Sequence, residues 1–477
     1  MMENAGMMLL SKAAQVLDGK LVGADIEFSA VSTDSRSISA GDLFIALQGE
    51  KFDGSQFIAL SAEKGAVAAL VNAANYHGEP VPCPLLLVDD TRLALGKLSG
   101  YWRDQFSIPV VGVTGSNGKT TVKEMLTAVL QVAAGRDDGV LATQGNFNND
   151  IGMPLTLLKL RAHHRYAVIE MGMNHAGEID YLTRLARPDV AVINNAGSAH
   201  MEGLGSLKAI ALSKGEIFSG LTAQGAAVIN ADEEFASMWR ELAAGHTIIE
   251  FAVDAQVAIG ATWQVQNFGS RIYVRTPIGN FSAHLQVPGI HNVRNALAAT
   301  AAAVALNVSP EIIAAGLEKF SGVSGRLQRK TALSGAAVID DSYNANPASL
   351  RAAISVLALA AGKKILVLGD MGELGIDAAR LHAEMGAEAR ELGVSKLFAL
   401  GELSAYAVQA FGADAQHFQR IEDLLEALKP ELDASCTVLV KGSRFMRMER
   451  VVKDLVSGEQ QVVSGKGAIN LPLSTHQ

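Results

Sequence analysis

Short runs of apolar residues alternate with helix-like stretches through the middle of the chain. Runs such as RYAVIEMG (165–172), DVAVINNAG (189–197) and GAAVINAD (225–232) each give way to glycine or polar residues. Such alternation is typical of a parallel β-sheet covered by helices. The segment from about 250 to 290 is more irregular and predicts an antiparallel insertion, with a helix after it.

The same pattern restarts after a glycine-rich joint, SGVSGRLQ (321–328). The strand-like segments beyond it each end in glycine or a polar group: GAAVIDD, KKILVLGDMGELG, SKLFALGE and TVLVKGS. Because ligands sit beyond the carboxyl ends of strands in open α/β sheets, the residues at these ends should border one crevice. They are Asp340, Asp341, Asp370, Gly401 and Lys441. The last third of the chain therefore predicts a Rossmann-like domain.

With 477 residues the chain is too long for one compact core, and we predict three domains. Short strands and turns occupy the first part, which ends in the proline-rich EPVPCPLLLVDD. We predict an α/β protein with a small α/β domain at 1–90, a central P-loop ATPase-like parallel-sheet domain at 91–326 and the Rossmann-like domain at 327–477.

Composition narrows the class of protein. Hydrophobic residues make up 49% of the chain and charged residues 19%, which indicates a globular protein rather than a disordered one. The net charge of -9 argues against broad nucleic-acid binding. Cys83 and Cys436 are too few for a disulfide framework or a zinc cluster, which suits a reducing cytoplasm. No apolar run reaches the roughly 20 residues of a membrane span and no leader peptide is evident, so we expect a cytoplasmic protein without membrane insertion.

A phosphate-binding loop is predicted where the apolar run VVGVT meets GSNGKTT. The common pattern has glycine five positions before Gly118, but Val113 stands there, so the loop is a shortened one. Its position between a strand and a helix favours an anion cradle over a purely structural glycine turn. Lys119 would contact the terminal phosphates and Thr120 would hold Mg²⁺. The predicted nucleotide-binding residues of the loop are Gly115, Ser116, Asn117, Gly118, Lys119, Thr120 and Thr121.

This loop resembles that of the Mur ligase superfamily, the ATP-dependent amide ligases of cell-wall synthesis. The folylpolyglutamate synthetases have a similar loop, usually followed by Gly-Ser instead of Thr120-Thr121, so the difference favours the cell-wall ligases. Further matching motifs occur in order along about 95% of the chain: GNFNNDIGMPLTLL (145–158), EMGMNHAGEI (170–179), NNAGSAHMEGLGSLKAIALSKGEIF (194–218), HNVRNALAA (291–299), DDSYNANP (340–347), LGDMGELG (368–375) and VKGSR (440–444).

The resemblance implies an ATP-dependent acid-D-amino-acid ligase. The expected reaction joins D-alanyl-D-alanine to UDP-N-acetylmuramoyl-tripeptide through an acyl phosphate and releases ADP and phosphate, with ATP and Mg²⁺ as cofactors. We expect a monomer, although the resemblance does not specify the oligomeric state. Two alternatives are a folylpolyglutamate synthetase-like ligase and a nucleotide-binding regulator without ligase activity. The chain lacks the Asn-Lys-x-Asp stretch of guanine-binding switches, and the motifs DMGELG and STDSRSISAGDLFIAL favour the cell-wall ligases.

Catalytic and metal-binding roles are implied for Lys119, Thr120 and three further residues. Glu170 ends the strand YAVIE, where a carboxylate points into the crevice, although it could instead cap a helix or pair with an arginine. His200 resembles the second metal ligand of the family, whereas a lone loop histidine is more often a surface or core residue. The lysine that matches Lys214 is carbamylated in several relatives, and the alternative is a lysine on a helix surface. Carbamylation requires a neutral amine, which burial favours by lowering the lysine pKa.

The resemblance also implies contacts with the nucleotide from beyond the loop. Asn292 and Asn295 match adenine and ribose contacts, although Asn292 could equally be a helix N-cap. Arg326 and Asp341 would reach ATP from the joint and the third domain, so closure of that domain would complete the site. Ser324 stands where relatives often have proline, so the joint lacks the residue that stiffens it in those relatives. This difference does not bear on the role of Arg326.

The remaining predicted residues concern the two other substrates. In the N-terminal domain, Ser35 and Arg36 are candidates for the uracil and diphosphate, against the alternative of a solvated turn. Residues matched to the muramoyl or diphosphate portion are Asn146, Asn148, Asn149, Asn174 and His175; asparagines of this kind also form turns. Candidates for the dipeptide are Asn344, Asn346, Ser443 and Arg444, the last two being able to hold a carboxylate.

Overall fold

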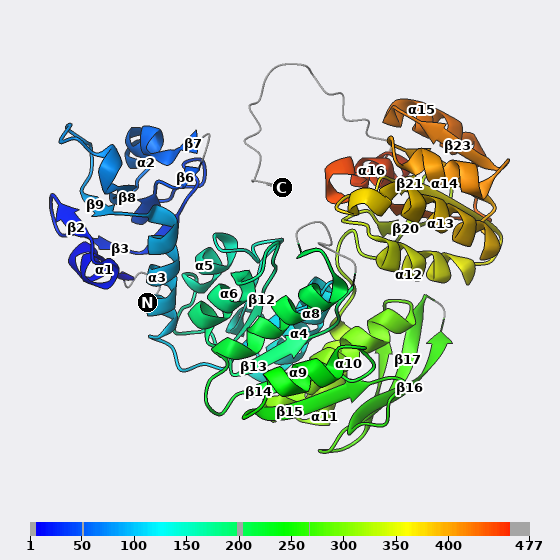
Figure 1. Cartoon of the computed structure of the whole chain (residues 1–477), viewed down its shortest axis with the longest axis horizontal. Coiled ribbons are helices and arrows are strands. Elements are labelled where there is room, and N and C mark those ends of the chain that lie inside the picture. Colours follow the sequence, from blue (N-terminus) through cyan, green and yellow to red (C-terminus); the bar gives the residue numbers. More distant parts are fainter. Residues whose placement is uncertain (1–5, 50–51, 198–203, 267, 458–477) are drawn as a thin grey trace.

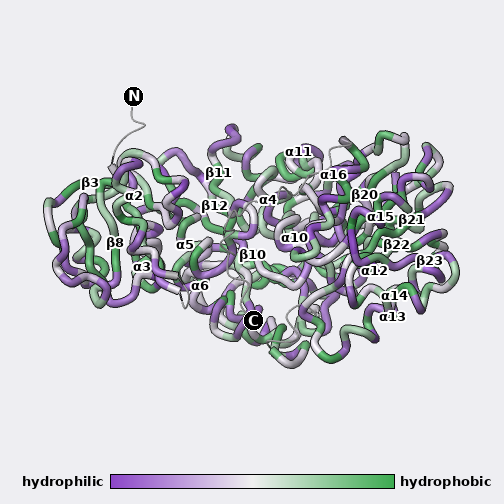
Figure 2. The backbone as a smooth tube through the Cα atoms, turned by 90° about the horizontal axis from the view of Figure 1, so that it is seen from above, coloured by the Kyte–Doolittle hydropathy of each residue, from purple (hydrophilic) through white to green (hydrophobic). Residues whose placement is uncertain are grey.

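The computed structural model describes residues 6–49, 52–197, 204–266 and 268–457. It contains three large β-sheets, formed one after another along the sequence and covered by helices (Figure 1). The view from above also places the central part of the chain between the N-terminal part and the C-terminal part (Figure 2). The predicted α/β class is confirmed. In the described residues, no helix combines the length and the apolar character needed to cross a bilayer.

The N-terminal sheet has five strands. Adjacent strands in it are parallel, except for one antiparallel pair at the edge. In spatial order they are β2 (Lys20–Val22), β9 (Leu85–Val88), β8 (Ala68–Asn72), β5 (Asp42–Ile45) and β4 (Ala30–Ser32). Leu43 and Ile45 point towards α1 (Leu10–Leu17) and α3 (Thr91–Arg103), whereas Phe44 points towards α2 (Ile58–Glu63). This alternation follows from the two-residue repeat of a strand. Two short ladders complete the domain, β1 (Met8–Leu9) with β3 (Glu27–Phe28) and β6 (Gln48–Gly49) with β7 (Phe52–Asp53).

The central sheet has nine strands, of which the first seven in spatial order are parallel. They are β11 (Val140–Ala142), β12 (Tyr166–Glu170), β10 (Val110–Thr114), β13 (Val190–Ile193), β14 (Ala226–Asn230), β15 (Thr247–Ala252), β16 (Ile259–Gln266), β17 (Gly269–Arg275) and β18 (Phe281–Leu285). The strands β16, β17 and β18 pair antiparallel, which confirms the predicted antiparallel segment and places it within the same sheet.

Helices cover both faces of the central sheet, so its inner strands are apolar throughout. Val111 and Val113 of β10 belong to the core beneath α4, α10 and α11, and Val110 belongs to the core on the other face. The covering helices are α4 (Lys119–Ala134), α10 (Ile290–Ala305) and α11 (Pro310–Lys319) on one face, and α5 (Gly152–Leu157), α6 (Glu178–Ala186), α8 (Leu207–Gly215) and α9 (Ala236–Leu242) on the other.

The C-terminal sheet has six strands and the predicted Rossmann-like character. They are β19 (Gln328–Thr331), β20 (Ala337–Asp341), β24 (Cys436–Lys441), β21 (Lys363–Gly369), β22 (Lys396–Leu400) and β23 (Ala415–Phe418), and only β19 is antiparallel to its neighbour. One face is covered by α12 (Pro347–Ala358), α13 (Ala378–Glu391) and α14 (Ser404–Phe411), and the other by α15 (Ile421–Leu428) and α16 (Glu449–Ser457).

Candidate active site

The predicted phosphate loop joins the buried strand β10 to the helix α4. Gly118 has φ +78°, and a Cβ at this position would lie 2.3 Å from Oδ1 of Asn295 and 2.5 Å from Nδ2 of Asn194. Glycine is therefore required here for both backbone conformation and space. The first turn of α4 begins directly after it, so the free N–H groups of that turn face the loop. A helix N-terminus of this kind favours an anion.

The end of β13 fixes the shape of this loop through two consecutive asparagines. The backbone N–H groups of Ser116 and Asn117 donate to the carbonyl oxygen of Asn195 (3.0 Å) and to its Oδ1 (2.8 Å). The Asn194 amide donates to the carbonyl oxygen of Asn117 (3.0 Å) and to Oδ1 of Asn295 (2.8 Å). Asn194 and Asn195 are not among the residues predicted from the sequence. Their position directly after the strand AVI in DVAVINNAG was the available signal.

Lys119 lies partly buried in the crevice beside Glu170 and Arg326. Its Nζ donates to the carbonyl oxygen of Gly115 at 2.7 Å. Desolvation lowers the pKa of the Lys119 amine, the Glu170 carboxylate opposes this, and the Arg326 guanidinium adds to it. The ammonium is thus held at the mouth of the loop with only part of its charge compensated.

Glu170 is 2% exposed and occupies the end of β12, as the sequence predicts. Its Oε2 accepts from the hydroxyl of Thr120 at 2.9 Å and its Oε1 from the amide of Asn148 at 2.8 Å. Neither a helix cap nor an arginine partner is found for the Glu170 carboxylate within the described ranges. Its own N–H donates to Oγ1 of Thr143 at 2.9 Å, a contact that we did not predict. Asn148, predicted as a substrate contact, here orients a carboxylate of the site.

Lys214 lies on α8 and is 1% exposed, so the alternative of a surface lysine is wrong. Burial lowers the pKa of the Lys214 amine well below its ordinary value, and the positive charge of Lys119 lowers it further. Within the described part of the chain, the Nζ of Lys214 has no hydrogen bond or ion pair. The neutral amine is the form that carbamylation requires.

The residues present fit a magnesium ion. The Thr120 hydroxyl and the Glu170 carboxylate are oxygen donors beside Lys119, and Mg²⁺ prefers oxygen ligands. In the described ranges, no three of the His, Cys, Asp and Glu residues gather into a metal site. A magnesium site here would use the Thr120 hydroxyl and the Glu170 carboxylate, and the contribution of a carbamylated Lys214 stays a prediction. The fourth predicted ligand, His200, lies outside the described residues.

Asn292 and Asn295 lie on the buried side of the loop, with exposed fractions of 5% and 4%. The amide of Asn295 donates to Oδ1 of Asn292 at 3.1 Å, and the amide of Asn292 donates to the carbonyl oxygen of Pro288 at 2.8 Å. The N-cap of α10 is Gly289, so Asn292 is not the cap. Both asparagines contribute to the network behind Gly118, and their contact with the nucleotide stays a prediction. Thr121 is buried on the first turn of α4.

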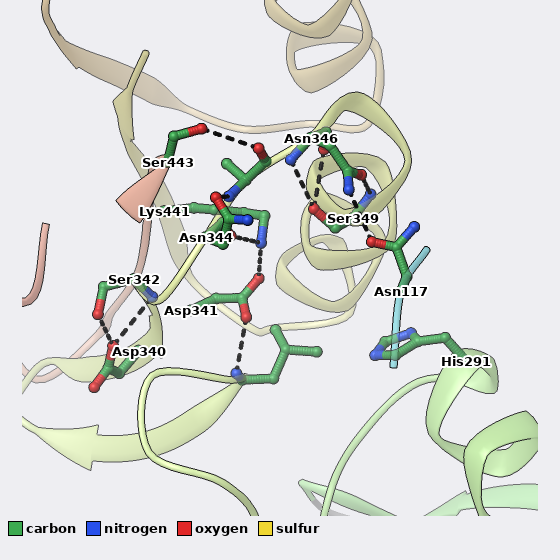
Figure 3. Close-up of polar contacts among 12 residues, drawn as sticks. Asn117, His291, Asp340, Asp341, Ser342, Asn344, Asn346, Ser349, Lys441 and Ser443 are labelled. Atoms are coloured by element: carbon green, nitrogen blue, oxygen red, sulfur yellow. Dashed lines mark hydrogen bonds and ion pairs between the residues drawn. The ribbon is translucent and has the colours of Figure 1, made fainter. Parts of the chain in front are cut away.

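Two residues from beyond the central sheet contact the loop. Nη2 of Arg326 donates to the hydroxyl of Thr120 at 3.1 Å, and the amide of Asn346 donates to Oδ1 of Asn117 at 2.8 Å. Asn346 also caps α12 by accepting from the N–H of Ser349. Figure 3 shows Asn117 directed towards the Asn346 and Ser349 cap. The third domain and the joint thus contact the phosphate loop directly.

Asp341 is committed to a buried ion pair in the third domain. Its Oδ2 accepts from Nζ of Lys441 at 2.5 Å, and its Oδ1 accepts from the N–H of Leu327 at 3.1 Å (Figure 3). Burial raises the pKa of the Asp341 carboxyl, and the charge of Lys441 opposes that shift. The pair ties the end of β20 to the joint, and contact of Asp341 with ATP stays a prediction.

The predicted dipeptide residues are gathered at the carboxyl ends of β20 and β24. The Ser443 hydroxyl donates to the carbonyl oxygen of Ala345 at 3.1 Å and accepts from the N–H of Gly372 at 2.8 Å. The N–H of Arg444 donates to Oδ1 of Asn344 at 3.3 Å. Ser443 therefore joins three loops of the third domain.

The other predicted substrate residues have no hydrogen bond or ion pair to the phosphate loop within the described ranges. Arg36 is exposed and pairs with Asp34 at 2.8 Å, and the Ser35 carbonyl oxygen accepts from Lys64 at 2.9 Å. Asn149 accepts from the N–H of Gly152 at the start of α5. Three remaining members of this set lie in turns between elements of the central domain: Asn146, Asn174 and His175.

His291 gives the fold a sensitivity to acid. Burial, together with the charges of Lys441 and Arg294, lowers the pKa of this imidazole to about 4. The unfolded imidazole takes up a proton below its ordinary pKa of 6.5, so stability is full above pH 6.5 and falls as the pH drops towards 4. We expect the free energy of unfolding to fall less in His291→Gln than in the wild type between neutral pH and about pH 5. The difference between the two proteins is at most about 2 kcal/mol, because the His291 ring is partly exposed. Equal losses of Tm in the variant and the wild type would contradict this.

Comparison with known proteins identifies the class. Three domain families match the chain: the Mur ligase family, catalytic domain (residues 27–103), the Mur ligase middle domain (113–303) and the Mur ligase, glutamate ligase domain (325–444). The chain belongs to the Mur ligase family.

The relatives are similar over almost their whole length. A protein of Escherichia coli (strain K12) named UDP-N-acetylmuramoyl-tripeptide--D-alanyl-D-alanine ligase is 40% identical over 450 residues, which cover 94% of this chain and 98% of that protein. A crystal structure of MurF from Acinetobacter baumannii has a TM-score of 0.87 at 37% identity and covers 94% and 99%. MurF ligase from Thermotoga maritima, in complex with ADP, has a TM-score of 0.78 at 27% identity and covers 89% and 96%.

Proposed function

We propose that the chain joins D-alanyl-D-alanine to UDP-N-acetylmuramoyl-tripeptide at the expense of ATP, giving the UDP-linked pentapeptide of peptidoglycan synthesis. The observation that supports this most directly is the convergence on one loop of Lys119, the Thr120–Glu170 pair and Arg326 from the joint. Relatives 40% identical over nearly the full length bear the name of this activity, and a structural relative holds ADP. This similarity favours the cell-wall reaction over folylpolyglutamate synthesis and over a regulator without ligase activity.

The reaction needs an activated carboxylate because a carboxylate and an amine do not condense in water. A carboxylate oxygen of the tripeptide attacks the γ-phosphorus, the bond to the β-phosphate oxygen breaks, and ADP leaves. The dipeptide amine then attacks the acyl carbon, phosphate leaves with the bonding electron pair, and the amine loses a proton as the amide forms. Two anions must approach in the first step, and the Lys119 ammonium reduces their repulsion. Thr120, Glu170 and a carbamylated Lys214 would hold magnesium, with His200 as a further predicted ligand, and the ion would supply additional screening of the phosphate charge.

We infer that each of the three domains binds a different substrate. We place the UDP end of the nucleotide-sugar peptide in the N-terminal domain (1–90), with Ser35 and Arg36, and ATP in the central domain (91–326). The dipeptide belongs in the third domain (327–477), near Asn344, Ser443 and Arg444. The Asn146–Asn149 turn and the Asn174–His175 turn would border the path of the muramoyl peptide between them. We infer a monomeric, cytoplasmic enzyme.

A phosphate-release assay with omitted substrates tests this function. We expect release of phosphate from ATP at full rate only when both the UDP-tripeptide and D-alanyl-D-alanine are present, with a product whose mass equals the sum of the two minus water. A parallel assay offers a folate and glutamate in place of these two substrates. Phosphate release at the same rate without the dipeptide, or release with the folate and glutamate, would overturn the proposal. Offering tripeptides with lysine and with diaminopimelate in parallel reveals which one the enzyme selects.

A further inference from the structure

Two arginines from different parts of the chain pack against one aromatic ring. The guanidinium carbon of Arg326 lies 4.6 Å from the centroid of the Tyr343 ring, and that of Arg444 lies 5.6 Å from the same centroid. Arg326 belongs to the joint, Tyr343 follows β20, and Arg444 follows β24. A guanidinium within about 6 Å of a ring centroid is attracted by the ring's electron-rich face. Tyr343 therefore joins two cations that would otherwise repel one another.

The opposite ends of these arginines reach the two sides of the proposed site. Nη2 of Arg326 donates to the hydroxyl of Thr120, on the first turn after the phosphate loop. Arg444 follows Ser443 and lies beside Asn344, in the group proposed for the dipeptide, and its Nη1 pairs with Glu449 at 2.9 Å. Among the aromatic rings of the described part of the chain, Tyr343 is the one that lies within about 6 Å of both guanidinium carbons.

The backbone of Tyr343 is attached to the joint. Its N–H donates to the carbonyl oxygen of Gly325 at 3.1 Å, and a Cβ at Gly325 would lie 3.2 Å from the Cβ of Tyr343. The Asp341–Lys441 pair precedes it and the Asn346 cap of α12 follows it. Tyr343 is thus linked to the joint through its backbone and to Arg326 through its ring, so the position of the joint and the surface against which Arg444 packs depend on each other.

We propose that Tyr343 is a positioning residue that couples nucleotide binding to dipeptide binding, by holding Arg326 and Arg444 on one ring. This rests on the proposed function, in which the nucleotide meets Arg326 and the dipeptide carboxylate meets Arg444. An anion that fixes either guanidinium on the ring also fixes the ring for the other. The effect is reciprocal, so each ligand tightens the binding of the other by the same factor.

The test measures this factor in titrations of the full-length enzyme with a non-hydrolysable ATP analogue and Mg²⁺, with and without saturating D-alanyl-D-alanine. In the wild type we expect the dipeptide to tighten binding of the analogue by about fivefold or more. Tyr343→Phe keeps the ring and should keep the factor. Tyr343→Leu and Tyr343→Met lack an aromatic face and should reduce the factor to about one, while each ligand alone still binds. The use of two variants protects the test against poor folding of one of them.

Tyr406→Leu, an exposed tyrosine on α14, is the matched control and should keep the wild-type factor. A wild-type factor near one, or an undiminished factor in the folded leucine or methionine variant, would overturn the coupling. The wild type is also assayed for pentapeptide formation. Absence of product would overturn the proposed function, whereas product formation with an unchanged factor in Tyr343→Leu would refute the coupling alone.

Discussion

Lys119→Ala is expected to abolish formation of ADP and pentapeptide when all substrates are present, with a loss in kcat of about 10³-fold or more. Within the described residues, the Lys119 ammonium is the only one that donates a hydrogen bond to the phosphate loop. Its acceptor is the carbonyl oxygen of Gly115. Removal of a preorganised group that neutralises developing charge typically costs about 10²–10³ in rate, and here two substrates repel each other as well. Phosphate release and product mass, measured under saturating substrates, give the result.

The fold should survive this change, because desolvation makes the Lys119 charge unfavourable in the crevice. We therefore expect the Tm of Lys119→Ala to equal or exceed that of the wild type. Lys97→Ala, an exposed lysine on α3, serves as the control and should leave both rate and Tm unchanged. A Lys119→Ala enzyme that forms ADP at the wild-type rate would disprove the role of the loop and the proposed function with it.

Lys214→Ala is expected to show the second large effect, a loss in kcat of about 100-fold. Lys214 is almost fully buried, and its amine is held towards the neutral form that carbon dioxide can carbamylate. The carbamate would add a carboxylate to the oxygen donors of Thr120 and Glu170. Because a small carboxylic acid can replace that group, formate or acetate should restore part of the activity of Lys214→Ala in a concentration-dependent manner.

Lys208 lies on the same helix and is exposed, so Lys208→Ala is the matched control for Lys214→Ala. We expect full activity from it and no response to formate. The apparent affinity for Mg²⁺, measured from the dependence of rate on magnesium concentration, should fall in Lys214→Ala and recover with formate. Activity of Lys214→Ala equal to that of Lys208→Ala would show that the buried lysine has no part in the reaction.

Much of the fold could be predicted because its signals are local. The strand ending in Glu170 and the turn Gly118-Lys119-Thr120 follow from short apolar runs and glycine, and both lie where the sequence placed them. Hydrogen-bond partners between distant segments could not be predicted in this way. The contact of Asn148 with Glu170 and that of Asn346 with Asn117 join loops from different strands, and only the packed sheets determine which amide reaches which oxygen.

Burial explains a second difference between the sequence and the structure. A lysine within a helix gives no sign in the sequence of which face it occupies, and Lys214 proves to be on the inner one. Asn292 and Asn295 could bind a base or support a loop, and the same amide chemistry serves both purposes. In the structure both asparagines lie behind Gly118 and form hydrogen bonds that support the loop. The spacing of polar residues along α10 does not by itself reveal these contacts.

The asparagine network around the phosphate loop has a consequence for how nucleotides bind. The N–H groups of Ser116 and Asn117, and the carbonyl oxygen of Asn117, already have partners from the end of β13. Little backbone entropy is then left to lose when a triphosphate arrives, so its association should resemble docking to a rigid receptor. Selectivity for the nucleotide would in that case come from the preformed shape of the phosphate loop. Conformational change on substrate binding would be confined to the domain that delivers the dipeptide.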